Sequence, residues 1–204
     1  MAIEIIQGRA DHPVQRVADL IWTTDSPLVD YLFMGRANWD RMVAINWPQN
    51  IGGICHSKSR LAVEQGEIVG IIVTHDPATM DRHFEASRER MKYAASSELA
   101  RHFDQAFDLL GKLFPHPPAS SHYVLDLAVD RQHHRRGIGR QLMESAIAEA
   151  KALGRRSVNL DVAGESEAVS FYRSLGMEVA IETKIPELEH DHGIGVHYHM
   201  TLAV

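Results

Sequence analysis

The stretch that most constrains the fold is residues 125–153, an apolar run followed by a basic turn with two glycines and an amphipathic segment. Apolar positions after the turn recur at helical spacing, so the stretch predicts a buried strand, a tight turn and a helix at about residues 139–153. Such a turn points backbone N–H groups and the positive end of a helix dipole at one spot, where a phosphate fits. The sequence therefore predicts a site for a phosphorylated cofactor.

Composition narrows the class of protein. The chain has 204 residues, 45% of them hydrophobic and 24% charged, as is usual for globular proteins, and we expect one domain over residues 1–204. The formal net charge of -6 argues against a nucleic-acid partner, because clustered Lys and Arg bind such partners. Cys55 is the only cysteine, so no intramolecular disulfide can form, and its simplest role is that of a small buried group.

Nothing in the sequence predicts secretion or membrane insertion. The N-terminus has neither a basic segment nor an apolar run of signal-peptide length, and no apolar stretch is long enough to span a bilayer. A single cysteine also fits a reducing compartment. We therefore expect a cytoplasmic protein with no membrane partner.

The chain before this stretch predicts a strand, three helices, a hairpin and a helical segment. Asp11 and either Asp25 or Ser26 are expected to cap the first two helices. The first strand is expected to be buried on both faces, and the second arm of the hairpin is apolar enough to be central. The elements are expected at residues 3–6 (strand), 13–22, 27–32 and 39–47 (helices), 60–64 and 67–74 (hairpin), and 81–114 (two helices).

The chain after this stretch predicts a second strand-helix unit beside the first. Residues 158–162 alternate apolar and polar side chains as a strand does, and residues 168–175 have the spacing of a short helix that ends at Gly176. Residues 177–183 and 196–203 are expected to form a final antiparallel pair, joined by a polar loop.

The glycine-rich turn excludes two familiar phosphate sites. Leu142 stands where the dinucleotide fingerprint needs its third glycine, and the sequence has no Gly-Lys-Ser or Gly-Lys-Thr of a P-loop. On its own, Gly137-Ile-Gly139 also fits a plain strand-to-helix connection. A basic cluster favours the anion site, because arginines add charge-assisted hydrogen bonds to phosphate. This cluster consists of Arg131, Arg135, Arg136 and Arg140.

Two segments resemble the motifs of one family. Residues 128–142, AVDRQHHRRGIGRQL, resemble the acetyl-CoA signature of the GCN5-related N-acetyltransferase (GNAT) family, (Gln or Arg)-x-x-Gly-x-(Gly or Ala) after an apolar strand. Residues 165–177, ESEAVSFYRSLGM, resemble its second motif, Asn-x-x-Ala followed by a Phe/Leu-Tyr pair and Leu-Gly. The motifs stand in the family's order and separation, and the resemblance covers residues 123–179.

The resemblance implies an α/β (α+β) fold, the GNAT-like acyl-CoA N-acyltransferase fold. In that fold a twisted, mixed and mostly antiparallel central sheet has helices on both faces. Strands at residues 123–129 and 157–162 would run parallel and separate at one end, so that pantetheine fits between them. The helical insertion at about residues 77–118 would cover the acceptor side of the site as a wall or lid.

The resemblance also implies a reaction. The chain would be an N-acetyltransferase that uses acetyl-CoA as cosubstrate and acetylates a primary amine of a small molecule or peptide by direct attack, with no metal. A homodimer is kept as an option. The alternative, from a different class, is a non-catalytic acyl-CoA-binding or regulatory domain that kept the cofactor site and lost turnover.

By resemblance, the cofactor is held by the first strand of the motif, the turn and the second motif. His134 stands where the family has Gln or Arg, Glu165 where it has Asn, and Met177 where it has an aromatic residue. A carboxylate cannot donate the hydrogen bond that the family's Asn gives to pantetheine. The expected cofactor contacts come from Leu127, Ala128, Val129, His134, Arg135, Gly137, Ile138, Gly139, Arg140, Glu165, Ala168, Phe171 and Tyr172.

Three residues are candidates for acid and base. By resemblance, Tyr172 is the general acid that protonates the departing sulfur. The alternative is that it is an aromatic residue of the core with no catalytic role. Tyr123 stands at the aligned position of the family's base, although a phenol is a poor base at neutral pH. Strand alternation places Asp126 on the opposite face from Tyr123, and there we favour a buried structural carboxylate over a catalytic one. Further options for the base are His75, His122 and a water relay.

Four C-terminal histidines, spaced as His190-x-His192 and His197-x-His199, could present like faces on extended chain, as a zinc site requires. No carboxylate or cysteine spacing completes a ligand set, so we favour solvated histidines and expect no metal. His197 or His199 could instead line the acceptor pocket, because the last strands border that pocket in the family.

Overall fold

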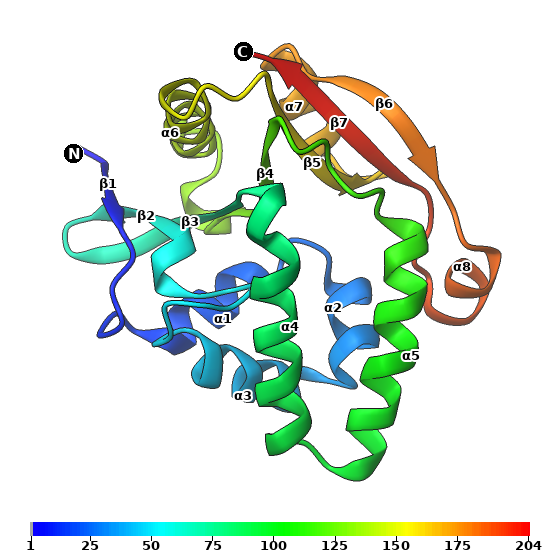
Figure 1. The fold of residues 1–204 in the computed structure, drawn as a ribbon. Helices are drawn as coiled ribbons and strands as arrows, with labels where there is room; N and C mark the ends of the chain where they lie inside the picture. The colour runs from blue at the N-terminus through cyan, green and yellow to red at the C-terminus, as the bar shows by residue number, and fades with distance from the viewer. Residues whose placement is uncertain (1) are drawn as a thin grey trace.

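A seven-stranded mixed sheet runs through the protein, whose computed structural model describes residues 2–204 (Figure 1). In spatial order the strands are β1 (Glu4–Gln7), β2 (Ser59–Glu64), β3 (Glu67–His75), β4 (Ser121–Val129), β5 (Ser157–Ala163), β7 (His197–Ala203) and β6 (Glu178–Thr183). Each neighbouring pair is antiparallel except β4 and β5, which are parallel. The mixed, mostly antiparallel sheet expected from the sequence is confirmed.

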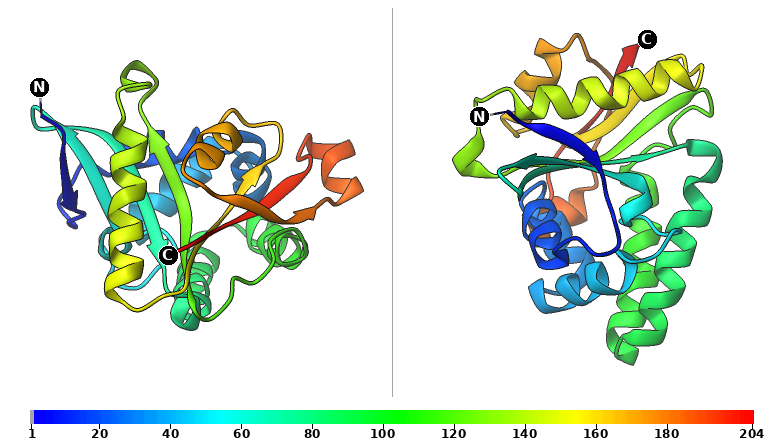
Figure 2. Two further views of the ribbon diagram at one scale, coloured as in Figure 1. Left: turned by 90° about the horizontal axis from the view of Figure 1, so that it is seen from above. Right: turned by 90° about the vertical axis from the view of Figure 1, so that its left-hand side faces the viewer.

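Helices cover both faces of this sheet (Figure 2). They are α1 (Val14–Trp22), α2 (Ser26–Phe33), α3 (Arg36–Asn46), α4 (Pro77–Ala94), α5 (Ser97–Leu113), α6 (Ile138–Ala152), α7 (Ala168–Ser174) and α8 (Pro186–His192). On one face, Leu142 and Met143 of α6 share a core cluster with Leu160 of β5. On the other, Val17 of α1 and Phe103 of α5 share a cluster with side chains of β3. None of the described helices is long and apolar enough to cross a bilayer.

The insertion between β3 and β4 consists of α4 and α5, which stand side by side (Figure 1). Asp76 caps α4 by accepting a hydrogen bond from the N–H of Ala78 (3.0 Å). Pro77 takes the first helical position, where its missing N–H leaves no bond unmade, so the helix begins earlier than the predicted residue 81. Ser96 caps α5 and separates it from α4.

Two expectations for the N-terminal part are wrong. Asp11 does not cap α1, because the helix follows Pro13 with no capping side chain among residues 2–204, and Asp11 pairs instead with the exposed Arg9 (3.0 Å). β1 is not buried on both faces, because it lies at the edge of the sheet and its end residues are exposed. A β-branched run alone does not distinguish an edge strand from a central one.

The polar loop expected before β7 contains a short helix. Pro186 opens α8, and Gly193, in a left-handed conformation (φ 68°), ends it. His190 and His192 therefore lie on a helix and not on extended chain, which removes the strand-like spacing considered for a zinc site. Among residues 2–204, no group of three or more His, Cys, Asp or Glu side chains is placed to hold a metal ion.

β4 and β5 are paired only over their first residues. The parallel ladder joins Ser121–Val124 to Ser157–Leu160, yet β4 continues to Val129 and β5 to Ala163. Beyond the ladder the two strands separate, and residues 125–129 of β4 have no strand partner on that side. The splay expected from the family resemblance is confirmed.

A β-bulge changes which way the side chains of β4 face. Val73 of β3 is paired with Asp126, but the next residue, Thr74, is paired with Val124, so Leu125 is an extra residue in β4. His75 is paired with Tyr123 and faces the same way as Val73. Tyr123 and Asp126 therefore share one face, and the expectation that strand alternation separates them is wrong. Simple alternation fails here because the bulge inserts one residue between the two positions.

Candidate active site

The turn between β4 and α6 presents an uncapped helix N-terminus. Gly137 has a left-handed conformation (φ 77°), and the N–H groups of Ile138 and Gly139 follow in the first turn of α6. No side chain among residues 2–204 caps this helix, whereas Asp76 and Ser96 cap α4 and α5. Open N–H groups at the positive end of a helix dipole suit a phosphate, so the turn fits the diphosphate of a cofactor.

The arginines of this turn differ in their availability. Arg135 and Arg140 are exposed, and Arg140 donates a long hydrogen bond to Ser174 Oγ (3.4 Å). Arg136 instead forms two hydrogen bonds to the carboxylate of Glu64 (2.8 and 2.5 Å), a bidentate pair that ties the turn to β2. Arg135 and Arg140 flank the helix N-terminus and, unlike Arg136, form no ion pair with any described residue.

Other residues assigned to the cofactor by resemblance contribute backbone and support. The side chains of Ala128 and Ile138 are buried in the two core clusters, so only their backbone groups can contact a ligand. His134 lies against the end of β4, where its Nε2 donates to the carbonyl of Val129 (2.9 Å). His134 therefore fixes the turn to the strand.

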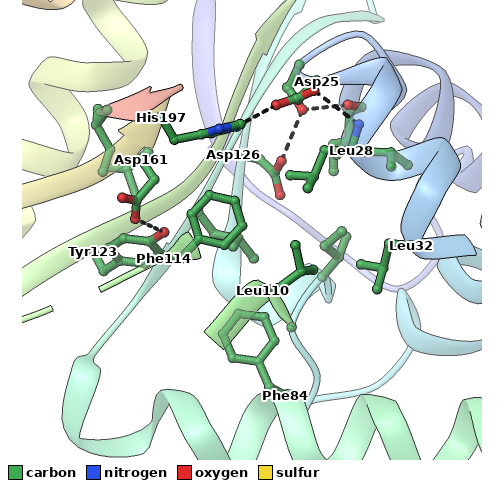
Figure 3. A pocket seen from close by; sticks show the side chains of 18 of the residues that line it. Asp25, Leu28, Leu32, Phe84, Leu110, Phe114, Tyr123, Asp126, Asp161 and His197 are labelled. Carbon is green, nitrogen blue, oxygen red and sulfur yellow. Dashed lines mark hydrogen bonds and ion pairs between the residues drawn. The ribbon is translucent and has the colours of Figure 1, made fainter. Parts of the chain in front are cut away.

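A cavity of about 500 Å³ extends from the gap between β4 and β5 to the helices on the opposite face of the sheet (Figure 3). At the gap it is lined by Leu127, Ala168 and Tyr172, which the resemblance assigned to the cofactor. Ser166 lines it as well, and its hydroxyl accepts a hydrogen bond from the N–H of Ala168 (3.2 Å). Glu165 is exposed and lies outside this lining.

The two motifs meet beside this end of the cavity. A Cβ atom placed on Gly139 would lie 3.5 Å from the ring of Phe171, so the glycine turn packs against α7. The rings of Phe171 and Tyr172 lie 5.2 Å apart between centroids. The turn thus lies beside α7, the helix that carries Tyr172.

Tyr172 has the properties of a proton donor. Its side chain is buried, and burial, followed by the negative charge of Asp126, raises the pKa of the phenol well above its usual value. The phenol is therefore neutral and holds its proton at physiological pH. It faces the cavity at the gap between the two splayed strands.

Asp126 is a half-buried carboxylate that faces the cavity. Its removal from bulk solvent raises the pKa of the carboxyl group to about 7, although the hydroxyl of Thr24 partly opposes this by donating a long hydrogen bond (3.4 Å). Among the described residues, no cationic side chain forms an ion pair with it. A carboxylate with this pKa can accept a proton near neutral pH.

Tyr123 is engaged in a hydrogen-bonded network. Its hydroxyl donates to Asp161 Oδ2 (2.8 Å), and His199 Nδ1 donates to Asp161 Oδ1 (3.1 Å). Asn159 Nδ2 in turn donates to His199 Nε2 (3.1 Å). Burial, the charge of Asp161 and this hydrogen bond raise the pKa of Tyr123 well above that of a free phenol. Tyr123 therefore cannot serve as a base near neutral pH.

His197 joins β7 to α2 across the cavity. Its Nε2 donates to Asp25 Oδ2 (3.0 Å), and its Nδ1 donates to the carbonyl of Gly195 (3.0 Å). Asp25 also caps α2 as expected, by accepting from the N–H of Leu28 (3.2 Å). His197 and Asp25 line the cavity (Figure 3), whereas His199 is not part of the lining and contacts Asp161, which is.

The other histidines considered as bases lie away from the cavity lining. His75 is buried and donates through Nε2 to the carbonyl of Gly53 (2.7 Å), and burial lowers its pKa to about 4. His122 is buried beside Glu149 (3.4 Å) in a separate small hollow. Neither side chain reaches the space between the splayed strands.

The far end of the cavity is a chamber with apolar walls. Three helices around it, α2, α4 and α5, each contribute large apolar side chains. Figure 3 shows Leu32, Phe84 and Leu110 on one side of Asp126, and the carboxylates of Asp25 and Asp161 on the other. The chamber walls comprise Ile21, Leu28, Val29, Leu32, Phe33, Trp39, Met42, Met80, Phe84, Met91, Phe107, Leu110 and Phe114.

Comparison with known families assigns the chain. The family model described as "Acetyltransferase (GNAT) family" matches residues 38–177, which span the hairpin, the insertion and both motifs. The chain belongs to the GNAT family of acetyltransferases. No match is found among curated proteins.

Solved structures share the fold over nearly the whole chain. An N-acetyltransferase from Staphylococcus aureus Mu50 is 10% identical, covers 98% of this chain and 100% of its own, and has a TM-score of 0.68. An acetyltransferase from Bacillus subtilis in complex with CoA is 15% identical, covers 100% and 99%, and has a TM-score of 0.57. A GNAT family acetyltransferase from Elizabethkingia anophelis with acetyl-CoA bound is 14% identical, covers 99% and 98%, and has a TM-score of 0.58.

Several polar residues of the site were not singled out by the sequence. Thr24 and Asp25 directly precede α2, and the sequence predicted only a helix-capping role for Asp25. Asp161 is one of the polar residues that alternate along β5, and Ser166 lies beside the position that matched the family's Asn. The pairing of β5 with β4 is the signal that could have placed Asp161 near Tyr123, because Asn159 is paired with Tyr123 and Asp161 lies two residues farther along β5, on the same face.

Proposed function

We propose that the protein is an N-acetyltransferase that transfers the acetyl group of acetyl-CoA to a primary amine. One observation carries this proposal: a single cavity joins the gap between the splayed strands, where Tyr172 lies, to Asp126 and the chamber beyond it. The complexes of fold relatives with CoA and acetyl-CoA support the choice of cosubstrate. We further propose that residues 1–204 act as one domain, with α4 and α5 as its acceptor-side insertion.

The chain's own groups suit this cosubstrate. The uncapped N-terminus of α6, with Arg135 and Arg140, would hold the diphosphate. The unpaired edge of β4 at residues 125–129 would hydrogen-bond the pantetheine arm as a neighbouring strand would, with Ser166 facing the same gap. Acetyl-CoA supplies an acetyl group already activated as a thioester.

Asp126 and Tyr172 divide the proton transfers between them. Asp126 accepts the proton that the attacking amine must lose, and its pKa of about 7 leaves a useful fraction ionised at neutral pH. Tyr172 delivers its proton to the sulfur as the carbon–sulfur bond breaks. Tyr123 holds Asp161 in place and donates no proton to the reaction. The ionised Asp126 and the neutral Tyr172 line the same cavity, which gives both groups a task that a non-catalytic acyl-CoA-binding domain would lack.

Binding and turnover can be tested separately. Calorimetric titration with acetyl-CoA is expected to show binding, and release of free thiol from acetyl-CoA in the presence of primary amines is expected to show transfer. Absence of both heat and thermal shift at millimolar acetyl-CoA would exclude the proposed cosubstrate. Binding without thiol release across all amine classes would favour the non-catalytic alternative.

Tyr172→Phe tests the acid. The variant keeps the ring and loses the proton, so we expect kcat to fall by about 100-fold while acetyl-CoA affinity changes little. Tyr93→Phe is the matched control, because Tyr93 is 95% exposed on α4 and lies outside the cavity. An unchanged kcat in Tyr172→Phe would remove Tyr172 as the acid.

A further inference from the structure

Among the described residues, Asp126 is the cavity carboxylate that has no imidazole beside it. Asp25 faces His197 and Asp161 faces His199, so each of these has an imidazole beside it. Asp126 faces only the hydroxyl of Thr24 among the described residues that hydrogen-bond to it. An unpaired carboxylate away from bulk water is stabilised by any cation that reaches it, and the cavity offers room for one.

Within residues 2–204, the chamber beyond Asp126 has no carboxylate in its apolar walls that could pair with a second ammonium group on the acceptor. Its walls are apolar side chains of α2, α4 and α5, with Phe84 and Leu110 among them (Figure 3). Of the charged residues of the lining on these helices, Arg88 is paired with Glu85 (3.1 Å), and the side chain of Asp81 is 84% exposed to solvent, outside the apolar walls. A second ammonium group would therefore lose its hydration without gaining an ion pair.

The polar side of the cavity is equally unsuited to a negative group. Asp25, Asp126 and Asp161 all line the cavity, and Figure 3 shows their carboxylates away from Leu32, Phe84 and Leu110. A carboxylate attached next to the amine would lie among like charges. Amino acids and peptide C-termini are thereby disfavoured as acceptors.

We propose that the acceptor is a monoamine with a compact apolar body, aryl or alkyl, whose ammonium group pairs with Asp126 while the body fills the chamber between α2, α4 and α5. This inference rests on the proposed amine acetylation. It assigns specificity to the insertion, because α4 and α5 supply the walls that an apolar body would contact.

Two matched pairs of amines test the inference. Butylamine and 1,4-diaminobutane differ by one positive group, and 2-phenylethylamine and phenylalanine differ by one carboxylate. We expect kcat/KM to be at least about tenfold higher for the monoamine of each pair. Calorimetric binding of 2-phenylethylamine to the CoA-loaded protein gives a readout that does not depend on turnover.

The outcomes separate the inference from the proposed function. Transfer to the diamine or the amino acid in preference to its monoamine would overturn the inference and leave the acetyltransferase standing. Binding of the monoamine without transfer would support the proposed amine-binding chamber and overturn the proposed function. If no monoamine is either bound or acetylated, the inference is overturned.

Leu110→Glu adds a carboxylate to the chamber wall. If the chamber excludes a second cation because its walls are apolar, the ratio of kcat/KM for 1,4-diaminobutane to that for butylamine is expected to rise at least about tenfold. Gln105→Glu adds the same charge to the exposed side of α5 and is expected to leave this ratio unchanged. A thermal melt and CoA binding show whether Leu110→Glu is folded. If it is not, the wild-type amine pairs still decide the inference.

Discussion

At the scale of single residues, the burial of Asp126 opposes the role of general base that we propose for it. Burial disfavours its ionised form, which raises its pKa to about 7, but a general base must be ionised to work. A pKa near neutral pH reconciles the two, because the group is easily ionised and still basic enough to take a proton. The same burial lowers the stability of the fold at higher pH.

Asp126 should govern the rise of activity with pH. The wild-type kcat/KM is expected to increase through an apparent pKa near 7, as the carboxyl group loses its proton. Asp126→Asn is expected to lower kcat by about 100-fold or more and to remove this limb of the pH profile. Asp108→Asn, on the exposed side of α5, serves as the control. A variant that kept the limb would assign the titration to another group.

Asp126 should also make stability depend on pH. Its folded-state pKa of about 7 lies above the ordinary 3.8, so the folded protein retains a proton that the unfolded chain releases between these values. The free energy of unfolding therefore falls as pH rises from 3.8 to about 7 and stays reduced above it.

Asn cannot ionise, so the free energy of unfolding of Asp126→Asn should not fall with pH in this way. The difference between the variant and the wild type in this free energy is expected to be about 2–4 kcal/mol more favourable to the variant at pH 9 than at pH 4. Urea unfolding at the two pH values measures this gain. An equal difference at both values would show that Asp126 does not titrate with a raised pKa.

At the scale of elements, the turn before α6 is formed by residues that are contiguous in the sequence. Its signal is contiguous in the sequence, since the strand, the glycines and the amphipathic helix follow one another without interruption. For that reason the strand, turn and helix proposed to hold the cofactor could be predicted from the sequence. The left-handed conformation of Gly137 directs the following N–H groups toward one spot.

Gly137→Ala should weaken CoA binding through the backbone. An alanine at φ 77° costs about 1–2 kcal/mol, and relief of that strain would move the turn, so we expect Kd for CoA to rise about fivefold or more. Gly154→Ala imposes similar strain at the other end of α6 (φ 66°). Both variants should melt at lower temperature, but only Gly137→Ala should lose CoA affinity by calorimetry. Equal affinity in the two would show that the turn's conformation is not needed for binding.

The acceptor side could not be predicted in the same way, because its signals are not contiguous. The face of Asp126 depends on the extra residue Leu125, and a bulge leaves no mark in a pattern of alternation. Asp161 is in the site because β5 pairs with the start of β4. The chamber needs helices from opposite ends of the N-terminal half, α2 and α5, to come together, which hydrophobic periodicity does not specify.

At the scale of the whole molecule, the sheet is two halves joined by a short ladder. β1 to β4 form one half and β5 to β7 the other, and the ladder between them covers only residues 121–124 and 157–160. A ligand that hydrogen-bonds the open edge of β4 would extend this joint. Cofactor binding is therefore expected to stabilise the backbone where the strands separate.

Hydrogen exchange can locate this effect. On addition of CoA, amides at residues 125–129 of β4 and 161–163 of β5 are expected to exchange more slowly, because they lie on either side of the gap. The β2 strand, two strands away from the gap, is expected to keep its exchange rates. Protection confined to α6, with none at the gap, would contradict pantetheine binding between the strands.

In the proposed reaction, the two substrates are held by different parts of the structure. The diphosphate of acetyl-CoA would lie at the turn of α6, and the amine would reach Asp126 from the chamber among α2, α4 and α5. Neither substrate has to leave before the other arrives, so both can be present when the acetyl group moves. Cys55, the only thiol of the chain, lies outside the cavity lining and is not placed to carry the group in between. The proposed arrangement therefore predicts a ternary complex, in which no acetylated form of the enzyme has to accumulate.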